Sequence, residues 1–126
     1  MKKILMALTA AAWISISWTA FAGGEGPLDF PINEGSNAKA HKHNEEGIAE
    51  WNKGNFEAAL MHFQTASKIN GSVGESHFNE AICLDKLGKH GAATMHFKAA
   101  RANSGGNMKI LKSKILNDHA PVGEGS

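Results

Sequence analysis

The sequence predicts an all-α protein in which two helix–turn–helix repeats are followed by a C-terminal capping helix, together a short α-solenoid. Three observations support this fold class. The chain has no proline between Pro31 and Pro121, so long helices are allowed throughout that stretch. It resembles itself at an offset of 34 residues without a gap. Within each repeat the apolar residues follow helical spacing and stop at glycines.

The N-terminal residues 1–22 have the character of a secretory signal peptide. Two lysines are followed by an uncharged, mostly apolar run over 4–18 and by Ala-Phe-Ala at 20–22, a small–x–small cleavage pattern. We therefore expect cleavage after Ala22 and a periplasmic or secreted mature chain. An uncleaved membrane anchor is the alternative, because the uncharged stretch approaches the roughly 20 residues that a spanning helix needs.

Glycine and proline dominate the next segment, 23–37, and predict a flexible leader because both residues disfavour helix and central strand. Leu28, Phe30 and Ile32 nevertheless alternate within it. The alternative is that these three side chains dock on the domain and cover an exposed edge. At the other end, 120–126 is expected to be a frayed tail.

The repeated domain is predicted over 38–119, with repeats at 40–73 and 74–107. In the first repeat a helix over 37–53 ends at Gly54, a residue suited to the left-handed conformation after a helix. Asn55 then follows as a candidate N-cap. The identities between the repeats are His43, Glu46, Ile48, Gly54, Ala58, Ala59, Met61, His62, Phe63 and Ala66, which recur as His77, Glu80, Ile82, Gly88, Ala92, Ala93, Met95, His96, Phe97 and Ala100.

A fifth helix is predicted over 107–118. Met108, Leu111 and Ile115 lie on one face at helical spacing, and lysines occupy the other face. This pattern is typical of a capping helix that covers the last repeat and meets solvent on its outer side.

These repeats resemble the tetratricopeptide repeat (TPR) family, whose motif also has 34 positions. The resemblance covers about 40–105 and rests on the small, glycine and aromatic positions Gly47, Gly54, Ala59, Phe63 and Ala66 and their counterparts Ala81, Gly88, Ala93, Phe97 and Ala100. Small residues are needed where two helices approach closely. The chain departs from the family in having Gly71 and Gly105 where proline is usual. Two repeats also bury less than solenoids generally need, so homodimerisation or docking of the leader is expected.

Composition excludes several classes of function. The 13 Lys and Arg residues nearly balance 12 Asp and Glu, so the chain is not a strongly basic nucleic-acid binder. The single cysteine, Cys83, excludes an intrachain disulfide framework and a Cys-cluster zinc site. No phosphate-binding loop, haem motif or nucleophile motif is found. We therefore expect a non-enzymatic protein without a cofactor and, after signal cleavage, without membrane attachment.

The resemblance implies that the first helix of each repeat lines a concave surface that binds a segment of another envelope or periplasmic protein. An apolar centre with polar neighbours is typical of recognition surfaces. For Trp51 the alternative is that its side chain turns inward and fills the core instead of facing a partner. The expected partner-binding residues are Asn44, Ile48, Trp51, Phe78, Asn79, Ile82 and Asp85.

Seven histidines leave metal binding open as an alternative function. His43 with Glu46, and His77 with Glu80, each place an imidazole and a carboxylate on one helix face. The two pairs are expected to converge on one Cu(II), Ni(II) or Zn(II) ion if they bind metal at all. His62 and His96, each beside a core phenylalanine, are instead expected at the surface. A third alternative is a self-assembling structural module.

Overall fold

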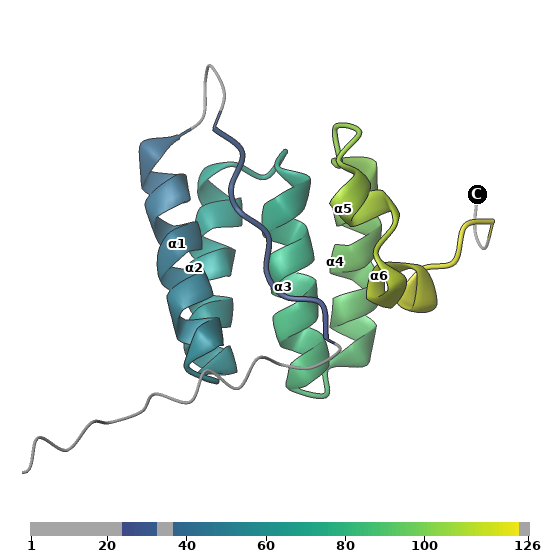
Figure 1. The fold of residues 1–126 in the computed structure, drawn as a ribbon, viewed down its shortest axis with the longest axis horizontal. Coiled ribbons are helices and arrows are strands. Elements are labelled where there is room, and N and C mark those ends of the chain that lie inside the picture. The colour runs from purple at the N-terminus through teal and green to yellow at the C-terminus, as the bar shows by residue number, and fades with distance from the viewer. Residues whose placement is uncertain (1–23, 33–36, 124–126) are drawn as a thin grey trace, which may run out of the picture.

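The computed structural model describes residues 24–32 and 37–123. The predicted signal peptide at 1–22 lies outside the described residues. Six helices and no strand are found in the described part, which confirms the prediction of an all-α short helical repeat arrangement (Figure 1). None of these helices is both long and apolar enough to cross a membrane.

The helices form two antiparallel hairpins placed side by side, and two shorter helices close the end of the array (Figure 1). Helix α2 packs against α3 and so joins the hairpins, while α6 packs against α4. The helices are α1 (Ala38–Asn52), α2 (Phe56–Ile69), α3 (Gly74–Lys86), α4 (His90–Ala102), α5 (Met108–Leu111) and α6 (Lys114–His119).

Both hairpin turns contain a glycine in the left-handed region, as the sequence predicts. Gly54 has φ +81° and Gly88 has φ +76°, values that L-residues with a Cβ rarely adopt. The expected capping role of Asn55 is not found, because its side chain makes no capping hydrogen bond. It donates from Nδ2 to Glu50 Oε2 at 2.9 Å instead and so ties the turn to the end of α1.

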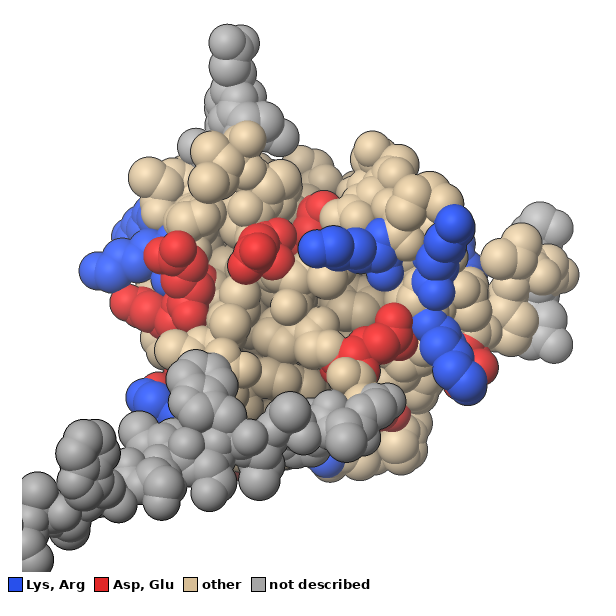
Figure 2. Space-filling model, in the orientation of Figure 1, with Lys and Arg blue, Asp and Glu red and all other residues tan. Residues whose placement is uncertain are grey.

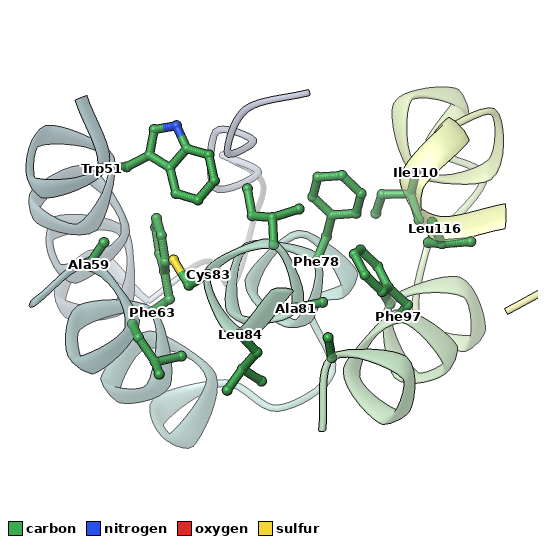
Figure 3. Packing of buried hydrophobic residues seen from close by; sticks show 14 of the residues in the cluster. Trp51, Ala59, Phe63, Phe78, Ala81, Cys83, Leu84, Phe97, Ile110 and Leu116 are labelled. Carbon is green, nitrogen blue, oxygen red and sulfur yellow. The ribbon is translucent and has the colours of Figure 1, made fainter. Parts of the chain in front are cut away.

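The core follows the small and aromatic positions of the two repeats (Figure 3). Phe63 of α2 and Phe97 of α4 have no exposed surface. A Cβ added to Gly47 of α1 would lie 2.5 Å from the Phe63 ring, which explains why that helix position lacks a side chain. In the second repeat Ala81 takes the corresponding position and is fully buried. Two helices therefore approach closely across an aromatic ring in each repeat.

The capping region differs from the single helix predicted over 107–118. It consists of α5 and α6, separated at Lys112 and Ser113. Ser113 is buried, and its hydroxyl accepts from the Leu116 amide as the N-cap of α6, a role that serine favours. The break also changes the buried face, because Ile110 and Leu116 are fully buried whereas the predicted core residue Met108 is half exposed.

Candidate peptide-binding groove

Residues 24–32 lie in an extended conformation along the face that α1 and α3 share (Figure 1). The segment runs opposite in direction to both helices and lies between them in the view. Rather than a free leader, these residues therefore form part of the folded domain. This is the face lined by the first helix of each repeat, where the resemblance led us to expect partner binding.

Two buried asparagines hold the backbone of this segment. Asn79 Oδ1 accepts from the Leu28 amide at 2.7 Å, and Asn79 Nδ2 donates to the Leu28 carbonyl at 2.9 Å. Asn44 Nδ2 donates to the same carbonyl at 3.0 Å. Asn79 Nδ2 also donates to Asn44 Oδ1 at 2.8 Å, which joins the two side chains into one network. Both asparagines have no exposed surface, so these bonds satisfy amide groups that would otherwise be buried without partners.

The apolar side chains of the segment anchor it unequally. Phe30 is 3% exposed and packs with Ala40, Ala66 and Val73 in a small cluster at the start of α1. Its ring also meets the His41 ring edge-on, with centroids 6.3 Å apart. Leu28 is partly buried against the main core. The third alternating residue, Ile32, is 83% exposed, so two of the three side chains dock.

The beginning of the segment is held at the opposite end of the face. Glu25 Oε2 accepts from the Ser113 hydroxyl at 3.1 Å and from the Ile115 amide at 2.8 Å. A cavity of about 320 Å³ lies beside this contact and is lined in part by Phe78 and Lys109. Figure 2 shows basic side chains gathered over α5 and α6, at the edge where an acidic residue of the segment is bound.

The apolar residues expected to bind a partner are covered in this structure, and Phe78 lines the same cavity as Glu25 and Leu28. Phe78 and Ile82 are buried, and Trp51, only 6% exposed, packs its indole on Phe56. Its Nε1 lies 3.9 Å from where a Cβ on Gly26 would be, so the docked segment contributes to covering the indole. Ile48 is partly buried beside the same core.

Asp85 is not part of the groove, by which we mean the face between α1 and α3 on which residues 24–32 lie. Its carboxylate Oδ1 is paired with His90 Nδ1 and with His119 Nε2, each at 2.8 Å, and so connects α3 to α6. The residue therefore belongs to the contact that closes the C-terminal end of the domain.

The two predicted histidine–glutamate pairs do not converge on one point. His43 and Glu46 are joined by His62 of α2, and His77 and Glu80 are joined by His96 of α4. Each pair is thus completed within its own repeat by a histidine that the sequence pattern placed at the surface. The repeat offset of 34 relates all three residues of one group to those of the other, a signal that was visible in the sequence.

Cys83 packs in the core with no exposed surface. Burial raises the pKa of its thiol to about 12, and the nearby Glu80 carboxylate acts in the same direction. The thiolate form is therefore rare at neutral pH, which leaves this cysteine as a small apolar core residue.

Comparison with known proteins gives no relative from which a function could be carried over: no family model, no curated protein and no solved structure matches the chain.

Proposed function

We propose that the chain is a non-enzymatic protein–protein interaction module that binds an extended segment of another protein between α1 and α3. We also propose that the chain belongs to the TPR family and acts in the periplasm as an adaptor or assembly factor for an envelope protein. One observation carries it: both backbone groups of Leu28 are bound by the side chains of Asn44 and Asn79.

Recognition of a backbone amide and carbonyl by side-chain amides is independent of the sequence bound. Any residue except proline offers the same two groups. Selectivity then comes from the apolar cluster in which Phe30 packs and from the contacts of Glu25 at the far end of the face. The favoured ligand is therefore an extended segment with a large apolar residue two positions after the bound backbone and an acidic residue three positions before it.

In this account residues 24–32 occupy the groove until a partner displaces them. A segment attached to its own binding site has an effective concentration of about 1 mM or more, so a free ligand must compete with it. With the segment in place Phe30, Phe78 and Ile82 are buried, which protects these side chains from unspecific association.

The test uses a fluorescently labelled peptide with the sequence of residues 24–32 and the full chain in three variants. Phe30→Ala weakens the chain's own segment but leaves the asparagines in place, so we expect it to bind the peptide at least about 10-fold more tightly than the unaltered chain does. Adding Asn79→Ala to Phe30→Ala should abolish this gain.

Ile32→Ala serves as the matched control, because this side chain is 83% exposed. It should bind the peptide no better than the unaltered chain. Equal binding by Phe30→Ala with and without Asn79→Ala, or no binding by either, would contradict the proposal.

A further inference from the structure

Within the part of the chain that the structure describes, three groups of histidines and carboxylates lie outside the groove, and their geometry separates them into two kinds. In each group one ligand atom from every residue lies within 4.8 Å of the others. The groups are His43, Glu46 and His62; His77, Glu80 and His96; and Asp85, His90 and His119. Six of the chain's seven histidines therefore belong to such a group.

The group at Asp85 is a hydrogen-bonded contact. The nitrogens of His90 and His119 both lie 2.8 Å from the same carboxylate oxygen, Asp85 Oδ1. A carboxylate oxygen only accepts, so both nitrogens carry protons that point at it. Their lone pairs are therefore not available to a metal ion in this arrangement.

The group at His43 has the spacing of a metal site instead. Its three facing atoms form a nearly equilateral triangle: His43 Nδ1 to His62 Nδ1 is 3.5 Å, His43 Nδ1 to Glu46 Oε2 is 3.4 Å, and His62 Nδ1 to Glu46 Oε2 is 3.2 Å. Ligands about 2.0–2.1 Å from a tetrahedral ion are about 3.3 Å apart. Each edge is longer than the optimum for a charge-assisted hydrogen bond, about 2.7–2.9 Å.

This first group is also open to solvent. The side chains of His43, His62 and Glu46 are 25%, 33% and 39% exposed, so an ion can reach them without unfolding and a water molecule can complete its coordination. Lys42 Nζ lies 4.0 Å from Glu46 Oε1, and the lysine side chain is itself well exposed.

In the second group, at His77, surrounding polar groups orient the ligands. His77 Nε2 lies 2.8 Å from the Gly71 carbonyl, which can only accept, so the ring proton is on Nε2. In the neutral ring the Nδ1 lone pair then faces His96 Nδ1, 3.4 Å away. A backbone carbonyl bound to the remote nitrogen is the usual partner of a metal-binding histidine.

The carboxylate of this second group is buried. Glu80 has a side chain only 3% exposed, its Oε2 lies 3.1 Å from His96 Nε2, and its Oε1 accepts from the Ser67 hydroxyl. The His96 ring and the Ser67 hydroxyl already offset the cost of burying this carboxylate, and a cation bound at this point adds to that pairing. By the same reasoning as at Asp85, His96 Nε2 carries a proton that points at Glu80 Oε2, and in the neutral ring its Nδ1 lone pair faces His77 Nδ1. An ion held by the two Nδ1 atoms therefore reaches the Glu80 carboxylate only when the His96 ring turns and gives up that hydrogen bond.

We propose that the chain binds two divalent transition-metal ions, one at His43, Glu46 and His62 and one at His77, Glu80 and His96. Two imidazoles and one carboxylate suit ions such as Zn(II) and Cu(II). The two sites lie across the α1–α2 and α3–α4 pairs and so fasten the two helices of each repeat to each other. This inference does not depend on the groove or its proposed function.

The experiment measures Zn(II) binding to the full chain by isothermal titration calorimetry. The unaltered chain should bind two ions. His62→Gln and His96→Gln should each remove one site, lowering its affinity at least about 10-fold, because even residues that only orient a metal ligand cost 10–100-fold when they are lost. The double variant should bind neither ion.

His41→Gln is the matched control, because His41 is the one histidine outside the three groups. It should keep both sites, and circular dichroism should show that all variants remain helical. Cobalt(II) substituted for zinc should give the visible absorption of a four-coordinate ion, and this band should disappear in the double variant. Absence of binding to the unaltered chain, or binding that the double variant retains, would overturn the proposal.

Discussion

Replacing Asn79 with alanine should release residues 24–32 from the domain. Asn79 makes three hydrogen bonds, two to the backbone of Leu28 and one to Asn44. Each bond contributes about 0.5–1.5 kcal/mol net, and Asn44 also loses a partner. Asn79→Ala should therefore lower the free energy that holds the segment on the domain by about 2–4 kcal/mol. Release of the segment lets water reach the groups that lose their partners, so the loss lies nearer the lower end the more completely the segment is released.

The loss is read most directly from hydrogen exchange at the Leu28 amide. In the unaltered chain this N–H is bound to Asn79 Oδ1, so it exchanges only when the segment opens. A loss of about 2–4 kcal/mol corresponds to exchange about 30- to 1,000-fold faster. Thermal unfolding gives a second measure: at about 5 °C per kcal/mol, the melting temperature should fall by about 10–20 °C if the segment unfolds together with the domain.

Two further variants make this prediction specific. Asn79→Asp keeps the size of the side chain but turns its donor into an acceptor that faces the Leu28 carbonyl and Asn44 Oδ1, so it should release the segment as alanine does. Asn52→Ala, at an exposed position at the end of α1, should change nothing. Unchanged exchange at Leu28 in Asn79→Ala would refute the assignment of the asparagine network.

Three other predictions concern the domain itself. Gly47→Ala should lower the free energy of unfolding by about 1–3 kcal/mol, since its Cβ would lie 2.5 Å from the Phe63 ring, whereas Gly91→Ala, with open space around the added Cβ, should be neutral or stabilising in the same denaturant titration. Cys83 should resist a thiol reagent at neutral pH until the chain is unfolded, because burial raises its pKa to about 12; fast labelling of the native chain would contradict this. Ser113→Ala should cost about 1 kcal/mol through loss of the α6 cap, and calorimetric unfolding that matches the unaltered chain would exclude that role.

The repeated part of the fold could be predicted because its signals are local. An offset of 34 without gaps, small residues opposite aromatic rings and a glycine at each hairpin turn all depend on residues close in the chain. The break between α5 and α6 was missed because the apolar spacing of 107–118 fits one continuous helix. Ser113 was the available signal, since a serine before a helical turn favours an N-cap.

The docked segment could be recognised only as an alternative. Glycine and proline argue against helix and strand, yet an extended chain needs neither when side chains satisfy its backbone. Asn44 and Asn79 are 35 residues apart, one more than the repeat, so the periodicity gave no indication that their amides converge.

The two histidine groups depended on contacts between helices of one repeat. His62 and His96 each precede a core phenylalanine, which predicts an outward direction, and their rings are indeed 33% exposed. They nevertheless reach the first helix of the hairpin, because α1 and α2, like α3 and α4, pack closely at Gly47 and Ala81. Side chains at the margin of a tight helix pair can face both solvent and the neighbouring helix.

The central claim is that the groove binds an extended segment and that residues 24–32 occupy it by the same contacts. The most direct measurement follows the Leu28 amide and the Asn79 side-chain amide by NMR in the isotope-labelled full chain, while unlabelled peptide of residues 24–32 is added to several times the effective concentration of about 1 mM. The Leu28 resonance should move to the position of an unstructured chain, while the Asn79 resonance stays, because the peptide restores its hydrogen bonds. A Leu28 resonance that is unstructured before peptide is added, or that does not move at saturation, would contradict the account.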